Sequence, residues 1–442
     1  MHRCIRPSLL VLPLLVWCFK VPASPMVIFT TYPAAQYQPM VDAFTKDNPG
    51  ITVKVINKKT PAMVNHILQS QKPEPDILWT SSPDAMALLQ QHGMLKHFEL
   101  PAKTYPENVR PNNERKFAYF AYSQFGFLSN RAYLEGAGLQ PPESWEALTS
   151  LNWKQHIALS SPSRSGTNHL IIEQVLQHYG WKRGWAILQR LAGNLSVITA
   201  RSFGVREGVM KGRFGTAPVV DFFYRTLVNR EHFDFYQWPE NTAIGAAIGI
   251  ASTSIQPRSA ERFITFTLSD KARPLLENKM GRIPAMPSEG KEQELETGQF
   301  DIALSANRYF LVNALFDQLV TLPLYDLQAF WEWYEEVKGA VSAHQPDLPP
   351  ADHARMEEKL MRAYSLMTRV PLPERRANDP DFSGQFLYQT HKTRLQIEME
   401  QTWRKDLHSR LDEARELLAD ITRAVNNTSP QTAAPSPAAT EG

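Results

Sequence analysis

One short segment of the chain combines the side chains with which proteins bind anions. Residues 161–169 read Ser-Pro-Ser-Arg-Ser-Gly-Thr-Asn-His, and an apolar-periodic run follows them to Tyr179. Hydroxyls, a guanidinium and a glycine therefore stand where a helix should begin, and a helix N-terminus presents unpaired N–H groups with a partial positive charge. This combination predicts a site for carboxylate or phosphate. A capped helix with a surface arginine is the alternative that the local sequence leaves open.

The elements that precede this segment alternate between strand and helix. The sequence predicts strands at 26–32, 51–56 and 75–79, helices at 37–46 and 61–69, and a helix that begins after Ser82-Pro83. Such alternation is typical of an α/β unit with a parallel sheet covered on both faces, where ligands collect at the carboxyl ends of strands. The polar residues at those ends are Thr30-Thr31-Tyr32 and Thr80-Ser81-Ser82.

A second α/β unit follows a loop at Pro141-Pro142. The sequence predicts helices at 168–179, 181–191 and 205–211, strands at 195–198 and 214–220, and a loop at 201–204. The strand predicted at 244–250 returns to the first unit, so the chain crosses between the units more than once, which favours hinge closure around a cleft. We expect a first lobe of residues 24–122 and 245–345, which includes late helices, and a second lobe of residues 123–244.

The C-terminal part predicts a helical extension over 346–425 and a disordered tail over 426–442. Further helices are expected at 258–268, 310–341 with a break at Pro323, 351–368 and 389–425. The last of these carries an apolar stripe at three- and four-residue steps, which suits docking on the globular body or on a partner helix. The aromatic residues around Trp331 are expected to pack, and the Ser-, Thr-, Pro- and Ala-rich tail is expected to stay disordered.

The first residues have the pattern of a secretory signal peptide. Arg3 and Arg6 precede a short apolar run, and Val21-Pro22-Ala23 supplies the small residues of a cleavage site. A retained N-terminal anchor is the alternative. Both cysteines, Cys4 and Cys18, lie in this segment, so the mature chain of residues 24–442 would contain none. An exported protein without disulfides suits a bacterial periplasm.

The charge of the chain depends on the same segment. The 47 basic residues include Arg3, Arg6 and Lys20, so removal of residues 1–23 leaves 44 basic against 45 acidic residues. This balance gives no argument for nucleic acid as a partner. The sequence contains no Walker loop, dinucleotide-binding glycine motif, His-Glu-x-x-His, paired-cysteine metal site or nucleophile elbow. We therefore expect no enzyme, no cofactor and no metal, and we expect His169 and His178 to lie on a solvated helix surface.

The layout resembles the type II periplasmic solute-binding proteins, in the group that contains ferric-ion and phosphonate binders. The resemblance rests on the signal, the two lobes, the Arg-Ser-Gly-Thr helix start at 164–167, the crossover, and Ala260-x-x-Phe263. The sequence segments 80–83, 160–165, 167–170 and 201–205 are similar to those of the phosphoglycerate transport regulatory proteins of enteric bacteria. This resemblance implies a periplasmic sensor component that binds a small phosphorylated or carboxylated metabolite and works with a membrane sensor kinase. The alternative is the binding subunit of an ABC importer for a phosphonate, a phosphorylated metabolite or ferric ion.

One departure from the ferric-binding relatives bears on the ligand. Those relatives have adjacent tyrosines after the strand that ends here at Val220, whereas this chain has Asp221-Phe222-Phe223-Tyr224. A single tyrosine is a poor site for a hard cation without further ligands. Iron binding is therefore not expected, and Tyr224 is expected to pack.

The candidate ligand-binding residues come from both lobes. Arg164 can clamp a phosphate or carboxylate with two hydrogen bonds, and Ser165, Gly166 and Thr167 can share the anion. Ser163 is either a further ligand or the N-cap of the helix. The remaining candidates are Arg201 and Ser202 of the second lobe and Thr31, Ser81 and Ser82 of the first. Ser82 is also a good N-cap, and the loop at Arg201 could simply lie on the surface.

Overall fold

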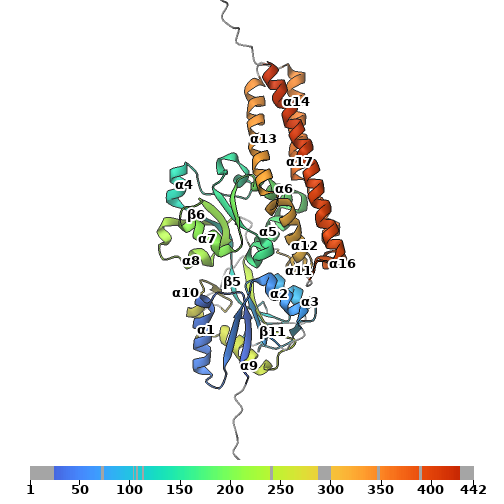
Figure 1. The fold of residues 1–442 in the computed structure, drawn as a ribbon. Helices are drawn as coiled ribbons and strands as arrows, with labels where there is room; N and C mark the ends of the chain where they lie inside the picture. Colours follow the sequence, from blue (N-terminus) through green and yellow to red (C-terminus); the bar gives the residue numbers. More distant parts are fainter. Residues whose placement is uncertain are drawn as a thin grey trace, which may run out of the picture.

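The computed structural model describes residues 24–428 except 71–73, 103, 106–107, 112–113, 239–241, 287–299, 346–348 and 388–390. Two α/β lobes lie one above the other, and a bundle of long helices extends beyond the second lobe (Figure 1). The expected two-lobed α/β fold with a helical C-terminal extension is confirmed. The segment expected to be a signal peptide lies outside the described residues.

The first lobe is built on a mixed sheet with the strand order β12-β5-β11-β3-β1-β2, and β4 pairs with β11. Its strands are β1 (Met26–Thr30), β2 (Val53–Asn57), β3 (Ile77–Thr80), β4 (Leu95–Lys96), β5 (Ala118–Ser123), β11 (Ile244–Ala251) and β12 (Ile283–Pro284). Its helices are α1 (Ala34–Asp47), α2 (Thr60–Gln69), α3 (Pro83–Gln91), α9 (Pro257–Thr267) and α10 (Arg273–Asn278). The sheet is parallel only where β1 pairs with β2 and β3, because β11 arrives from the other lobe and runs antiparallel to β3 and β5.

The second lobe has a five-stranded sheet with the order β10-β6-β9-β7-β8. Its strands are β6 (Phe125–Asn130), β7 (Ile157–Ser160), β8 (Leu195–Thr199), β9 (Thr216–Val220) and β10 (Phe233–Tyr236). Its helices are α4 (Arg131–Ala137), α5 (Gly166–Tyr179), α6 (Trp181–Ala192), α7 (Ser202–Met210) and α8 (Phe222–Arg225). The chain enters this lobe between β5 and β6 and leaves it between β10 and β11, which are the crossovers that the sequence predicts.

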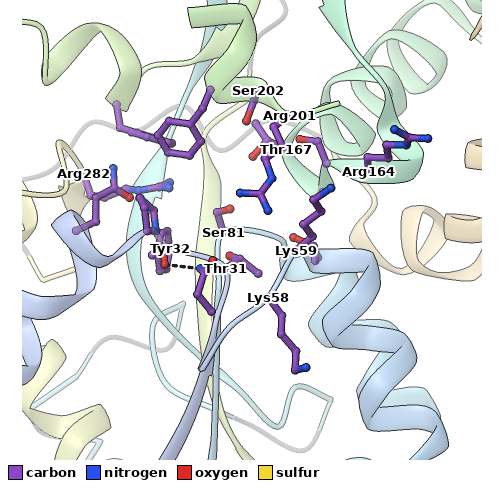
Figure 2. A pocket seen from close by; sticks show the side chains of 18 residues that line it. Thr31, Tyr32, Lys58, Lys59, Ser81, Arg164, Thr167, Arg201, Ser202 and Arg282 are labelled. Atoms are coloured by element: carbon purple, nitrogen blue, oxygen red, sulfur yellow. Dashed lines mark hydrogen bonds between the residues drawn. The ribbon is translucent and has the colours of Figure 1, made fainter. Parts of the chain in front are cut away.

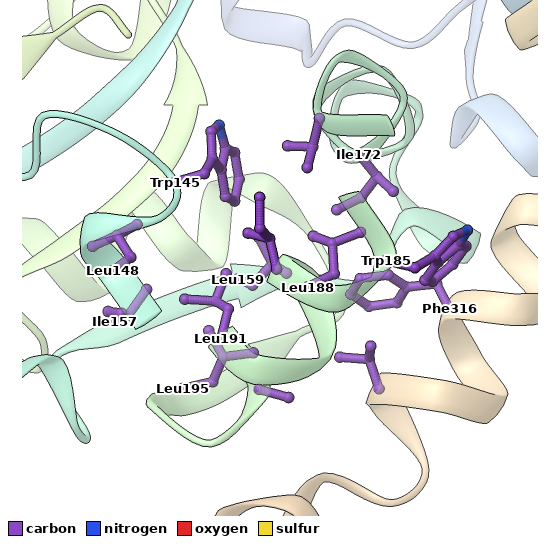
Figure 3. Packing of buried hydrophobic residues seen from close by; sticks show 14 of the residues in the cluster. Trp145, Leu148, Ile157, Leu159, Ile172, Trp185, Leu188, Leu191, Leu195 and Phe316 are labelled. Atoms are coloured by element: carbon purple, nitrogen blue, oxygen red, sulfur yellow. The ribbon is translucent and has the colours of Figure 1, made fainter. Parts of the chain in front are cut away.

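Two helices that the sequence analysis places with the first lobe pack elsewhere. After α11 (Ile302–Asn307), the buried apolar residues of α12 (Tyr309–Phe316) and α13 (Leu324–His344) belong mainly to the core of the second lobe. Figure 3 shows Phe316 of α12 in that core beside Trp185 of α6. The indole Nε1 of Trp331 donates to the carbonyl of Gln189 at 3.0 Å, so the aromatic stripe of α13 docks on α6. Periodicity shows that such a stripe is buried but not which lobe buries it.

The extension is a three-helix bundle of α13, α14 (Pro350–Thr368) and α17 (Arg394–Thr428), with the short helices α15 (Glu374–Ala377) and α16 (Pro380–Ser383) between the last two (Figure 1). The apolar stripe of α17 docks within the chain, since Trp403 is 2% exposed and stacks on Phe386 with ring centroids 5.5 Å apart. The helix continues through residues 426–428, which the sequence analysis places in the tail, and the rest of that tail lies outside the described residues. Among the described helices, none is long and apolar enough to cross a bilayer.

Candidate functional site

A cavity of about 80 Å³ lies between the two lobes, where several helices begin. From the first lobe it receives Thr31 and Tyr32 at the end of β1, Thr60 at the start of α2, and Ser81 after β3. The second lobe adds the start of α5 at 165–167 and the start of α7 at 201–203 (Figure 2). Several helix N-termini therefore direct partial positive charge at one space.

The charged side chains that line this cavity are all cationic. They are Lys58, Lys59, Arg164, Arg201 and Arg282, and no described lining residue carries a carboxylate. In Figure 2, Lys59 reaches up from the first lobe and Arg201 reaches down from the second into the space between them. Neither side chain has a salt-bridge partner among the described carboxylates. A cation-lined cavity without counter-charges is suited to an anionic ligand.

Arg282 is the most enclosed of these cations. It is 3% exposed, and its Nη1 donates a hydrogen bond to the hydroxyl of Ser123 on β5. Its guanidinium lies over the rings of Tyr32 and Phe222, 5.2 and 4.3 Å from their centroids. The Nε and Nη2 atoms have no hydrogen-bond partner in the described structure. Buried donors without hydrogen-bond partners are costly, so a ligand anion that approached this guanidinium would be stabilised.

Two neighbouring acids respond to the same environment. Burial raises the pKa of Tyr32 to about 12, although Arg282 and a hydrogen bond with Ser81 lower it, so the phenol stays protonated at neutral pH. Burial also raises the pKa of Asp221, while Arg225 and Arg282 lower it. Tyr32 can therefore donate a hydrogen bond within the cavity without adding negative charge.

The structure brings most of the sequence-predicted residues together. Eight of the ten line the cavity: Thr31, Ser81, Arg164, Ser165, Gly166, Thr167, Arg201 and Ser202. The other two do not. Ser82 is buried and donates to Asp84 Oδ1 at 2.6 Å, and Ser163 hydrogen-bonds Ser161. The N-cap of α5 is Ser165, whose hydroxyl accepts from the backbone N–H of Asn168 at 3.3 Å.

Arg164 and Arg201 differ in orientation. The guanidinium of Arg201 points into the cavity, whereas that of exposed Arg164 points away from Arg201 (Figure 2). Arg164 also lines a second cavity of about 670 Å³, between α2, α12 and the start of α17. Arg201 precedes helix α7, which begins at Ser202, where the sequence predicts a loop through residue 204.

The lobes touch beside the cavity at Gly166. A Cβ atom at this position would lie 2.6 Å from Thr60 Oγ1 and 2.9 Å from Ser82 Oγ, both in the first lobe. Only a hydrogen fits there, so a glycine lets the backbone of α5 approach the starts of α2 and α3.

Several residues in or beside the site were not identified, or were misplaced, from the sequence. Lys58 and Lys59 directly follow β2, and the strand-end rule could have found them, whereas no local pattern marks Arg282. His169 is fully buried rather than solvated, because α3, α11 and α12 cover its face of α5. Tyr224 stacks on Phe235 with ring centroids 5.7 Å apart, as expected of a packing residue. The ring of Phe222 packs against the guanidinium of Arg282.

Sequence comparisons relate the chain to binding proteins. Residues 72–306 match the family described as bacterial extracellular solute-binding protein. The chain is 26% identical over 373 residues to the phosphoglycerate transport regulatory protein PgtC of Salmonella typhimurium, which covers 82% of this chain and 89% of PgtC. A protein of Salmonella paratyphi A named for periplasmic 2-aminoethylphosphonate binding is 24% identical, over 54% of this chain and 70% of its own length.

Solved structures share the fold. The periplasmic binding protein AfuA of Actinobacillus pleuropneumoniae, with exogenous fructose-6-phosphate bound, aligns with a TM-score of 0.60 at 16% identity, over 66% of this chain and 98% of AfuA. The apo ferric ion-binding protein A of Pasteurella haemolytica aligns with a TM-score of 0.58 at 16% identity, over 67% of this chain and 98% of its own. Both match over nearly their whole length, so about a third of this chain has no counterpart in them.

Proposed function

Because this chain belongs to the bacterial extracellular solute-binding proteins, we propose that its cleft binds a small phosphorylated or carboxylated metabolite in the periplasm. The ligand would hold the lobes together, and a membrane protein would respond to the closed form. The chain binds rather than transforms this ligand. Binding would shift an equilibrium between open and closed lobes, because only the closed form brings both sets of side chains to one ligand.

The observation that carries this proposal is the cation-lined cavity with Arg282 buried inside it. Arg282 and the pair Lys59 and Arg201 lie on different sides of the cavity, and the hydroxyls of Thr31 and Ser81 lie between them (Figure 2). This separation suits a ligand with an anionic group at each end. A phosphoglycerate, with one phosphate and one carboxylate, has that form.

The same lining argues against two alternatives. The amine of 2-aminoethylphosphonate needs a carboxylate or a cluster of acceptors, and no described lining residue is acidic. Ferric ion needs oxyanion ligands and would be repelled by the arginines and lysines. The chemistry of the donor set therefore favours an organic ligand with two anionic groups.

We propose a sensor that acts with a membrane kinase rather than an importer subunit. Support comes from the likeness to a phosphoglycerate transport regulatory protein over 82% of the chain, against 54% for the phosphonate-binding relative. Deletion of the gene distinguishes the two roles. Loss of a sensor abolishes ligand-dependent induction of the transporter, whereas loss of an importer subunit abolishes uptake even when the transporter genes are expressed constitutively.

Calorimetric titration of the protein purified from the periplasm tests the binding proposal. The panel is 2- and 3-phosphoglycerate, phosphoenolpyruvate, 2-aminoethylphosphonate and ferric citrate. We expect saturable binding of a phosphoglycerate that Arg201→Ala weakens strongly. Arg213→Ala, which removes an exposed arginine of the same lobe outside the cavity, should bind like the parent. Silence with the whole panel would contradict the proposal.

A further inference from the structure

A buried polar network joins the two lobes behind the cavity. Asp84 lies in the first turn of α3 in the first lobe, and His169 is the fourth residue of α5 in the second. Both side chains are 0% exposed, and His169 Nε2 lies 3.4 Å from Asp84 Oδ2. The two helices that carry this pair also present Gly166 and Ser82, which touch beside the cavity.

Hydrogen bonds fix both members of the pair. Asp84 Oδ1 accepts from the hydroxyl of Ser82 at 2.6 Å and from the backbone N–H of Ala85 at 2.8 Å. Ser305 of α11 donates to Asp84 Oδ2 at 3.0 Å and lies 3.3 Å from His169 Nε2. His169 Nδ1 lies 2.9 Å from Asn313 Oδ1 on α12. The imidazole is therefore held between the amide of Asn313 on one side and Ser305 with the Asp84 carboxylate on the other.

The other ionisable groups around the pair include a second carboxylate, Glu173, whose pKa burial alone would raise but Arg308 and His169 lower. Glu173, on the same helix, is held by Arg308 in a buried ion pair at 2.8 Å. Tyr309 of α12 faces the imidazole at 4.1 Å between ring centroids, and Tyr119 of β5 feels the charge of Asp84. Burial raises the pKa of both phenols, so both are neutral across the physiological range.

A buried carboxylate beside a buried imidazole can share one proton with it. Burial raises the pKa of Asp84, although His169 and the hydrogen bonds from Ser82, Ala85 and Ser305 lower it. One proton shared between the carboxylate and the imidazole would neutralise the buried charge, whichever of the two groups holds it.

We propose that Asp84 and His169 form a proton-dependent latch between the lobes, so that closure around the ligand takes up one proton. The pair is a positioning device: it touches no ligand, and it sets the starts of α3 and α5 against each other at the cavity. This inference rests on the proposed function, because it requires that ligand binding and lobe closure are coupled.

The direction of the pH dependence follows from linkage. In the proposed latch, the closed pair keeps its proton at pH values where a solvated imidazole, with a pKa of about 6.5, has lost it. The stabilisation of the closed form is therefore complete below about pH 6.5 and is lost as the pH rises above it. One extra proton in the closed form gives a decrease in the closure constant that approaches about tenfold per pH unit.

Fluorescence energy transfer between the lobes can measure this without any ligand. Both native cysteines lie in residues 1–23, so the exported protein accepts labels at Lys46→Cys on α1 and Glu135→Cys on α4. Both positions are exposed, and α1 and α4 lie on the same side of different lobes (Figure 1). We expect the closed fraction to fall between pH 6 and pH 8.5. A closed fraction that stays constant over this range would overturn the proposal.

Variants identify the groups responsible. His169→Gln and Asp84→Asn should each flatten the pH profile, and His178→Gln, which removes an exposed imidazole of the same helix, should keep it. The latch is also refuted if His169→Gln retains the parent slope or if His178→Gln abolishes it.

Calorimetry of the parent protein keeps the test decisive if a variant fails to fold. Titration with 3-phosphoglycerate in buffers of different ionisation enthalpy at pH 8 should show uptake of about one proton per ligand. Binding without proton uptake refutes the latch and leaves the proposed ligand intact. If the closed fraction depends on pH but the protein binds no member of the panel, the latch is supported and the proposed ligand is refuted.

Discussion

Substitution of Gly166 by alanine should separate ligand affinity from folding stability. The new methyl group would lie 2.6 and 2.8 Å from Oγ1 and Cβ of Thr60 and 2.9 Å from Ser82 Oγ, all across the boundary between the lobes. The Ser82 hydroxyl can rotate, but the Cβ of Thr60 is fixed to the start of α2. The strain therefore arises only when the lobes are together.

The size of the effect follows from the cost of overpacking. Insertion of a methyl group into a filled contact costs about 1–3 kcal/mol. Because about 1.4 kcal/mol corresponds to a tenfold change in a binding constant, ligand affinity should fall about 5- to 150-fold. The second lobe itself should keep its stability, since Gly166 is the first residue of α5 and has no positive φ that alanine would strain.

Calorimetric affinity and the melting temperature of Gly166→Ala measure the two effects. Gly339→Ala is the matched control, because Gly339 lies within helix α13 and a Cβ there meets no atom within 4 Å. It should raise the melting temperature and leave affinity unchanged. Thr60→Gly in the Gly166→Ala background should restore part of the affinity. Parent-like affinity in Gly166→Ala, or an equal loss in Gly339→Ala, would refute the reasoning.

Three further predictions concern the charges and the bundle. Arg282→Leu should weaken binding of the anion by about 2–5 kcal/mol in calorimetry, with little loss of melting temperature, because this guanidinium has no described carboxylate partner; an unchanged affinity would remove Arg282 from the site. Arg308→Met should cost about 3–5 kcal/mol of stability at pH 7, since it leaves Glu173 buried and unpaired. Burial alone would raise the pKa of Glu173, but Arg308 lowers it. The parent therefore loses this stabilisation as the pH falls below about 4.5, and the destabilisation by Arg308→Met should shrink there. A loss of stability that stays constant in thermal melts from pH 7 to pH 4 would contradict this. Trp403→Ala should cost about 3–5 kcal/mol and hasten proteolysis within α17, and parent-like proteolysis would show that the stack on Phe386 does not hold the bundle.

Much of the candidate site was predictable because its signals are local. Thr31 and Ser81 end strands, Arg201 precedes a helix, and the segment at 164–167 begins one, so hydrophobic periodicity already places them at one edge of each lobe. The return strand β11 was visible for the same reason. These features depend only on residues close in sequence, and the pattern of two α/β units with crossovers dictates that their strand ends face a common cleft.

Contacts between distant segments were decided by tertiary structure alone. Arg282 joins the cavity because β12 pairs with β5 more than 150 residues earlier, and the same docking leaves its Nε and Nη2 atoms without a hydrogen-bond partner in the described structure. His169 looks like a helix-surface residue in the sequence, but α3, α11 and α12 close over it. Arg164 directs its guanidinium away from Arg201, which its sequence position does not reveal. A sequence pattern fixes which face of an element is apolar, whereas the partner of that face depends on packing, which sums weak contacts over the whole chain.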